Sequence, residues 1–254
     1  MKLIDFSNHQ ARGLVGAWPL DDRNNLTAKD LSNNRNNATL TNYAVWSNDG
    51  SAYFGGAAAG NYINLGNSTV FDLSSVLSLS VWVKKSTASQ NAGIFCKWYQ
   101  SSDNSNCFAL LFGQDAANDK LSFSILQTNI SAKSVAPSDS SIPAGVWTHI
   151  VAVANGSVLK LYRDGVPYST TTAYDGTINT STRNAVIGRL RTNDTTYSLT
   201  GNVKDARIYN RVLSDGEIKD MYYSSKELYL PMKLVPRRYF GIAGSIYRPK
   251  ILMF

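Results

Sequence analysis

The segment 147–163 constrains the fold of this chain more than any other part of the sequence. Two apolar runs, 147–154 and 158–163, flank Asn155-Gly156-Ser157. Asn-Gly readily takes the positive φ angles of a tight turn whose twist matches the strands on either side. Asp164-Gly165 then turns the chain again. The segment therefore predicts an antiparallel β-hairpin.

Further strands are predicted where apolar residues alternate or cluster between turn residues. At 77–83 the aliphatic residues all fall on one side of an extended chain, while Ser78, Ser80 and Trp82 fall on the other. We expect the aliphatic side to face the core, and Trp82 to lie on a more polar face or packed under a loop. The other predicted strands are 14–20, 52–54, 62–65, 185–188 and 201–209.

The polar composition leaves little room for helix. Asn, Ser and Thr supply 23, 29 and 17 residues, and their side chains compete with helical backbone hydrogen bonds. Of the 18 acidic residues, only Glu217 and Glu227 are glutamates, and the rest are aspartates. A single short helix is expected at 215–223, begun by a capping box between Ser214 and Glu217. These features predict an all-β fold with long polar loops and one short C-terminal helix.

The charge is concentrated at the C-terminal end. The net charge is +7, of which residues 226–254 carry +5, from six basic residues against Glu227. A nearly neutral body argues against a nucleic-acid-binding domain, whose basic residues should line one face. No apolar run is long enough to span a membrane, and the first residues lack the apolar core of a secretory signal. Cys96 and Cys107 are too few for a disulfide framework.

The sequence divides into an N-terminal arm (1–12), a β-rich body (13–223) and a basic, aromatic tail (224–254). Prolines disfavour helix in the tail, and its apolar fraction is high for a solvated arm. We expect it to dock onto a partner by strand addition or in a groove, although a solvated tail that aids solubility is the alternative. The expected docking residues are Lys233, Arg237, Arg238, Tyr239 and Phe240.

Several segments together resemble the laminin-G-like domains of the concanavalin A-like lectin/glucanase superfamily. The most specific are Trp147–Val151 followed by Leu161–Gly165, and the segment Lys204–Ser214. Residues 14–20, 30–34 and 77–83 precede them in the order that the family shows. The resemblance spans about residues 13–223 and implies a jelly-roll sandwich of two curved antiparallel sheets.

The resemblance also implies a biological setting. Domains of this group occur in secreted, cell-surface and bacteriophage virion proteins. Without a signal segment, and with so little cysteine, a virion assembled in the host cytoplasm is favoured. The tail would then bind other capsid or tail proteins. A homo-oligomer stays open, although no heptad repeat supports a coiled-coil trimer.

Laminin-G-like domains often bind calcium, and the resemblance places the ligands at Asp30, Asn33 and Asp205. Calcium takes six to eight oxygens from carboxylates, amides and backbone carbonyls. The family loop usually reads Asp-x-Ser-Gly-Asn, and Asn33 stands where the glycine would be. Asn tolerates positive φ, so the turn can survive. The alternative is that Asp30 simply caps its loop by accepting backbone hydrogen bonds.

Enzymatic activity is not expected. Glycoside hydrolases on this fold usually carry two glutamates at short spacing on one strand, whereas Glu217 and Glu227 lie ten residues apart near the predicted helix. An aspartate pair stays a formal alternative. His149 lies in mid-strand with no motif around it and is expected to be a structural histidine. No Gly-x-Ser-x-Gly elbow is present.

Glycan binding is the function that the sequence favours in place of catalysis. A sugar offers apolar C–H faces to aromatic rings and hydroxyls to Asn and Asp side chains. The candidate aromatic residues are Trp98, Tyr99, Tyr174 and Tyr197. The sequence therefore predicts a non-enzymatic phage structural or accessory protein that displays a lectin-like sandwich, with adhesion to host glycans as its role. The alternative is a free carbohydrate-binding module or lectin, followed by a hydrolase with degenerate acids.

Overall fold

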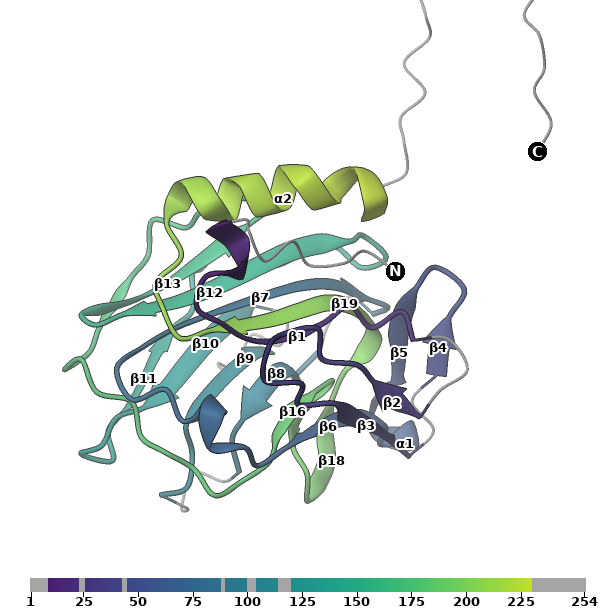
Figure 1. Cartoon of the computed structure of the whole chain (residues 1–254), viewed down its shortest axis with the longest axis horizontal. Coiled ribbons are helices and arrows are strands. Elements are labelled where there is room, and N and C mark those ends of the chain that lie inside the picture. The colour runs from purple at the N-terminus through teal and green to yellow at the C-terminus, as the bar shows by residue number, and fades with distance from the viewer. Residues whose placement is uncertain are drawn as a thin grey trace, which may run out of the picture.

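The computed structural model describes residues 9–22, 26–42, 45–87, 90–99, 104–113 and 120–229. Two large antiparallel sheets pack face to face, and helix α2 (Asp215–Tyr229) lies across the outside of one of them (Figure 1). The predicted all-β jelly-roll sandwich with a C-terminal helix is confirmed. The predicted docking residues from Lys233 to Phe240 lie outside the described part of the chain.

Sheet A is the sheet covered by α2. Its strands, in spatial order, are β14 (Val166–Pro167), β13 (Val158–Arg163), β12 (Thr148–Asn155), β7 (Val76–Lys85), β19 (Thr200–Tyr209), β5 (Ser51–Gly55) and β4 (Val45–Ser47). β1 (Leu14–Trp18) also pairs with β19, and β15 (Thr172–Ala173) with β13.

Sheet B is the opposite layer. Its strands, in spatial order, are β11 (Ala132–Val135), β10 (Leu121–Leu126), β9 (Phe108–Phe112), β8 (Ala92–Lys97), β16 (Ala185–Ile187), β6 (Tyr62–Gly66), β3 (Ala38–Thr41) and β2 (Thr27–Ala28). A separate hairpin joins β17 (Arg189–Arg191) to β18 (Asp194–Ser198). The short helices are η1 (His9–Ala11), α1 (Gly56–Ala59) and η2 (Thr69–Phe71).

The hairpin predicted at 147–163 is formed by β12 and β13, which pair with Ala154 opposite Leu159. At its turn the Asn155 Oδ1 atom accepts the backbone N–H groups of Ser157 (3.0 Å) and Val158 (2.8 Å). Gly156 has φ 92°, a conformation that glycine adopts without a steric penalty. The turn chemistry read from the sequence therefore sets the register of this pair.

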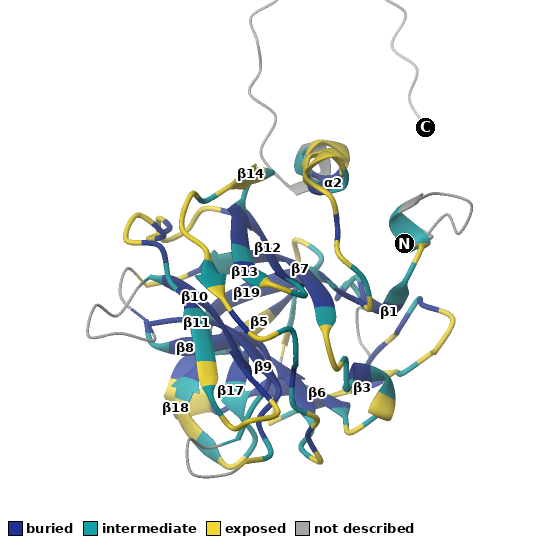
Figure 2. Cartoon of the chain, turned by 90° about the vertical axis from the view of Figure 1, so that its left-hand side faces the viewer, coloured by how far each residue is buried: buried dark blue, intermediate teal, exposed yellow. Residues whose placement is uncertain are grey.

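The core lies between the two sheets (Figure 2). The aliphatic side of 77–83 is fully buried there, as predicted. Trp18 is also fully buried, with its ring 6.0 Å from that of Phe71 and 6.1 Å from that of Phe95. Each large apolar side chain buried in this way contributes about 1.5–3 kcal/mol.

Trp82 is buried on the other side of β7, beneath helix α2 rather than beneath a loop. Its ring stacks on that of Tyr222 at 5.8 Å, and its Nε1–H donates to the Ser225 hydroxyl at 3.1 Å. These contacts explain why α2 continues to Tyr229 instead of ending near 223, because Ser225 is held against the sheet. Residues 224–229 of the predicted tail are thus helical.

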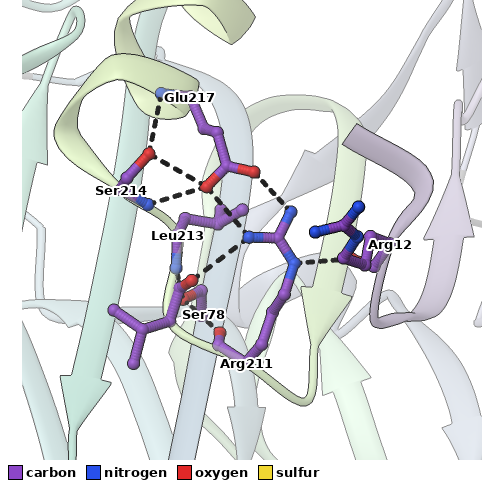
Figure 3. Close-up of polar contacts among 7 residues, drawn as sticks. Arg12, Ser78, Arg211, Leu213, Ser214 and Glu217 are labelled. Carbon is purple, nitrogen blue, oxygen red and sulfur yellow. Dashed lines mark hydrogen bonds and ion pairs between the residues drawn. The ribbon is translucent and has the colours of Figure 1, made fainter. Parts of the chain in front are cut away.

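Helix α2 begins with the predicted capping box (Figure 3). The Glu217 N–H donates to Ser214 Oγ at 3.3 Å, and the Ser214 N–H donates to Glu217 Oε2 at 2.9 Å. Arg211 adds an ion pair to Glu217 at 2.7 Å and donates from Nε to the Arg12 carbonyl, also at 2.7 Å. The start of the helix is therefore fixed to Arg211, which follows β19, and through Arg211 to the N-terminal segment. No helix in the described ranges is long and apolar enough to cross a membrane.

Candidate functional site

The β17–β18 hairpin lies against the outer face of sheet B, on the opposite side of the molecule from α2 (Figures 1 and 2). Leu190 and Trp98 pack there against a small apolar cluster that includes Tyr62, Cys96 and Leu111. The hairpin approaches β8 closely at Gly93, where an added Cβ would lie 2.3 Å from the backbone of Arg189 and Leu190. Glycine is therefore required at this position for the hairpin to cover the sheet.

Two arginine–tyrosine pairs meet where this hairpin adjoins the end of β8. The Arg183 guanidinium carbon lies 3.8 Å from the centre of the Tyr99 ring, and that of Arg191 lies 4.8 Å from the centre of the Tyr197 ring. Arg191 also donates from Nη1 to the Tyr99 carbonyl at 3.1 Å. We call Tyr99, Arg183, Arg191, Asp194 and Tyr197 the tyrosine–arginine cluster.

Asp194 balances the charge of Arg191 within the cluster. Its Oδ2 atom accepts from Arg191 Nη2 at 2.7 Å and from Nε at 3.1 Å. Hydrogen bonds from Thr196, followed by the Arg191 guanidinium, lower the pKa of the Asp194 carboxyl. Asp194 is therefore ionised at neutral pH, and the Arg191 side chain is held in one orientation.

The cluster combines the groups that recognise a polar ligand with an apolar face. Tyrosine rings supply flat apolar surfaces, and guanidinium groups stacked on them keep their N–H donors at the edge. All five cluster residues are partly exposed, although the Nε atom of Arg183 is buried. Such a surface can hold a sugar ring against an aromatic face while donors and the Asp194 carboxylate bind its hydroxyls.

The structure gathers three of the four predicted glycan-binding aromatics at this place: Tyr99 and Tyr197 in the cluster, and Trp98 beside it. Tyr174 does not join them. It is 8% exposed in the main core, where its hydroxyl accepts the Gly156 N–H and donates to the Ser75 carbonyl, each at 2.6 Å. Its ring therefore offers no face to a sugar.

The arginines of the cluster were missed by the sequence analysis. Arg183 and Arg191 reach their tyrosines from distant segments or across a hairpin, so no short motif joins each pair. The available signal was the run Arg189-Leu190-Arg191 within a body that carries little net charge. A concentration of arginine in such a body, next to predicted surface aromatics, would have pointed to this place.

The carboxylates predicted to bind calcium are already occupied by hydrogen-bond donors. Asp30 is 5% exposed and accepts the backbone N–H groups of Ala17, Ser32 and Asn36, each at 2.8 Å. This is the loop-capping alternative that the sequence left open. Asn33 is exposed.

Asp205 lies at a bulge in β19 with φ 49° and faces a cation of the protein itself. Its two carboxylate oxygens accept from Arg207 Nε at 2.7 Å and Nη2 at 2.9 Å. Among the described residues, no group of three His, Cys, Asp or Glu side chains comes together. Asp30 and Asp205 are therefore each engaged by donors of the protein itself, and calcium binding at these residues stays a prediction.

The two cysteines lie on different sides of sheet B. Cys96 belongs to the outer apolar cluster, whereas Cys107 belongs to the main core. In the β8–β9 register Cys96 stands opposite Ala109, so the hairpin does not bring the two thiols together. Both are free and buried, and burial raises the pKa of each thiol.

Comparison with known structures finds the same fold in carbohydrate-related and toxin proteins. Domain 4 of AbnA, an extracellular arabinanase from Geobacillus stearothermophilus solved with arabinotriose, is 18% identical; the match covers 82% of this chain and 98% of that domain, with a TM-score of 0.60. The binding domain of Paraclostridial Mosquitocidal Protein 1 is also 18% identical, with coverage of 84% and 52% and a TM-score of 0.64.

A botulinum neurotoxin type C structure, described with its interaction with two ganglioside molecules, is 14% identical, with coverage of 84% and 51% and a TM-score of 0.64. The chain thus spans about half the length of these two toxin structures. At these identities the likeness establishes the fold alone. A search of curated protein sequences found no match.

The family comparison is more specific than the structural one. The Laminin_G_3 family model, described as the concanavalin A-like lectin/glucanases superfamily, matches residues 54–219. This range covers more than half of the chain and includes strands of both sheets and the start of α2. The chain therefore belongs to the Laminin_G_3 family of the concanavalin A-like lectin/glucanases superfamily.

Proposed function

We propose that this chain is a non-enzymatic glycan-binding module and that the tyrosine–arginine cluster is its saccharide contact. The observation that carries the proposal is the convergence of Tyr99 and Tyr197 on Arg191, from segments nearly a hundred residues apart. The superfamily includes lectins, and one structural neighbour was solved with arabinotriose. Together these observations favour a saccharide over other small polar ligands.

The proposal that the chain is not an enzyme is supported by the state of its glutamates. Glu217 is paired with Arg211 at the start of α2, and the Arg211 hydrogen bond is the main cause that lowers its pKa to about 2. A general acid must hold a proton near the working pH, which Glu217 does not. Glu227 follows ten residues later in the same helix.

An array of immobilised neutral and acidic oligosaccharides tests the glycan proposal. We expect the full chain to be retained on a defined subset of glycans and Tyr197→Ala to weaken that retention by about tenfold, the effect of losing one central aromatic contact. Tyr223→Ala is the matched control, because Tyr223 is 50% exposed on α2, on the opposite face. Absence of any retention, or equal losses in the two variants, would contradict the proposal.

We further propose that the module is displayed on a bacteriophage virion and anchored by its tail, residues 224–254, with Lys233, Arg237, Arg238, Tyr239 and Phe240 as docking residues. The arrangement of the two faces supports this setting. Helix α2, which precedes residues 230–254, covers sheet A, whereas the β17–β18 hairpin that carries Arg191 and Tyr197 lies on the opposite side of the molecule (Figure 1). A module held by its tail would present the cluster outward. The alternative is a free carbohydrate-binding module.

Sedimentation with phage particles separates the two settings. The full chain should co-sediment with particles from a lysate of the source phage, and a chain ending at Tyr229 should remain in the supernatant while keeping its melting temperature and its retention on the array. Equal sedimentation of the two chains would rule out anchoring by the tail. Sugar retention without any sedimentation would favour the free module.

A further inference from the structure

An ion pair lies at the end of β8, two residues before Tyr99 of the tyrosine–arginine cluster. Lys97 is the last residue of β8, and its side chain is fully buried. Its Nζ atom lies 2.5 Å from Oδ1 of Asp72, which follows η2. Because the fully buried Lys97 ammonium needs a compensating charge, the partly exposed Asp72 carboxylate is held against the end of β8.

Ser181 connects this ion pair to the cluster. Its backbone N–H donates to the same Asp72 Oδ1 atom at 3.1 Å. Its hydroxyl donates to the Ser105 carbonyl and accepts the backbone N–H of Arg183 at 3.1 Å. Ser181 is 5% exposed and therefore lies below the surface that a ligand would touch.

Tyr99, over whose ring Arg183 lies, is hydrogen-bonded to the loop that contains Ser105. Asn106 Oδ1 accepts the Tyr99 backbone N–H at 2.6 Å, and the Asn106 carbonyl accepts from Asn179 Nδ2 at 3.3 Å. Tyr99 and Arg183 are thus both held through backbone hydrogen bonds, by neighbouring residues of two loops. The Asn179 amide and the Ser181 hydroxyl both bridge these loops, but the Ser181 hydroxyl also accepts the Arg183 N–H. Its loss would therefore release the Arg183 backbone relative to Tyr99.

We infer that Ser181 is a positioning residue, which sets the place of the Arg183 guanidinium over the Tyr99 ring without touching the ligand. Its influence on saccharide affinity rests on the proposed function of the cluster. Its influence on the Arg183–Tyr99 geometry is independent of that proposed function. This influence can be measured in the absence of any saccharide.

The side-chain NMR signals of Arg183 report this geometry, because a guanidinium stacked on an aromatic ring experiences the ring current. Tyr99→Leu supplies the reference shift without the ring. We expect Ser181→Ala to move the Arg183 signals most of the way to that reference, and Ser181→Thr, which keeps the hydroxyl, to leave them in place. Ser140→Ala is the matched control: Ser140 is fully buried and its hydroxyl donates to the carbonyls of Leu121 and Pro137.

The same variants are then applied to the oligosaccharide array used for the full chain. We expect Ser181→Ala to lose retention by about threefold to tenfold, with Ser181→Thr and Ser140→Ala unchanged. Unchanged Arg183 signals in Ser181→Ala, or equal displacement in the Ala and Thr variants, would overturn the inference whatever the array shows. Failure of every chain to bind the array would remove the glycan proposal, while the NMR result would still decide the role of Ser181.

Discussion

His149 is a buried histidine near the start of β12, beneath helix α2. Its Nε2 atom lies 2.9 Å from the Ser80 hydroxyl, and its ring lies 5.2 Å from that of Trp82 and 6.3 Å from that of Tyr222. Its Nδ1 atom has no hydrogen-bond partner among the described residues. Burial lowers its pKa to about 4, while Asp205 raises it and Arg207 lowers it by smaller amounts. The structural role expected from the sequence agrees with these contacts.

Stability should therefore depend on pH through His149. The pKa of His149 in the folded chain lies below its value in the unfolded chain, so between these two values the unfolded chain binds more protons. The contribution of His149 to the free energy of unfolding is therefore complete above about pH 6.5 and is lost as the pH falls to about 4. We expect a loss of about 3 kcal/mol from this residue over that range. Denaturant unfolding at several pH values should show this slope, and His149→Gln should flatten it. An identical slope in the variant would contradict this assignment.

Residue types alone predicted the candidate site incompletely. Trp98, Tyr99 and Tyr197 were found because aromatics in polar loops suit sugars, but the same rule selected Tyr174, whose ring the core needs. Exposure depends on the packing of the whole sandwich, which no local pattern reveals. The roles of Arg183 and Ser181 also depend on loops brought together from distant parts of the chain.

At the scale of single elements, local chemistry determined where α2 begins and tertiary packing determined where it ends. The Ser214–Glu217 capping box was visible in the sequence. The extension to Tyr229 depends on Trp82 and Ser225, which are far apart in the chain. The β17–β18 hairpin was not predicted, because its residues are mostly polar and show no apolar alternation.

The capping box gives an element-scale prediction. Ser214→Ala removes the acceptor of the Glu217 N–H and should destabilise the protein by about 1 kcal/mol. Ser224→Ala is the matched control, because its hydroxyl only donates to the Met221 carbonyl within the helix. Urea unfolding followed by circular dichroism measures both variants. Equal stability of Ser214→Ala and the unaltered chain would show that the contacts of Glu217 with Arg211 and with the backbone N–H of residue 214 are enough to fix the start of α2.

At the scale of the whole molecule, the two outer faces of the sandwich have different partners. Helix α2 covers sheet A with an apolar stripe that includes Ile218 and Met221. The outer face of sheet B carries a hairpin with two arginines, Arg189 and Arg191, and one tyrosine, Tyr197. The sandwich itself was predictable, because alternation and turn residues recur along the chain, whereas this difference between the faces was not. The difference between the two faces arises because helix α2 crosses the outside of sheet A and the β17–β18 hairpin crosses the outside of sheet B.

Amide hydrogen exchange of the full chain tests the central claim, that the tyrosine–arginine cluster binds saccharide. It is measured with and without the oligosaccharide that the array retains best. We predict slower exchange in 98–99 and in the segments around Arg183 and Arg191–Tyr197, with no change in α2. Protection confined to α2 or to sheet A, with the cluster unchanged, would contradict the claim.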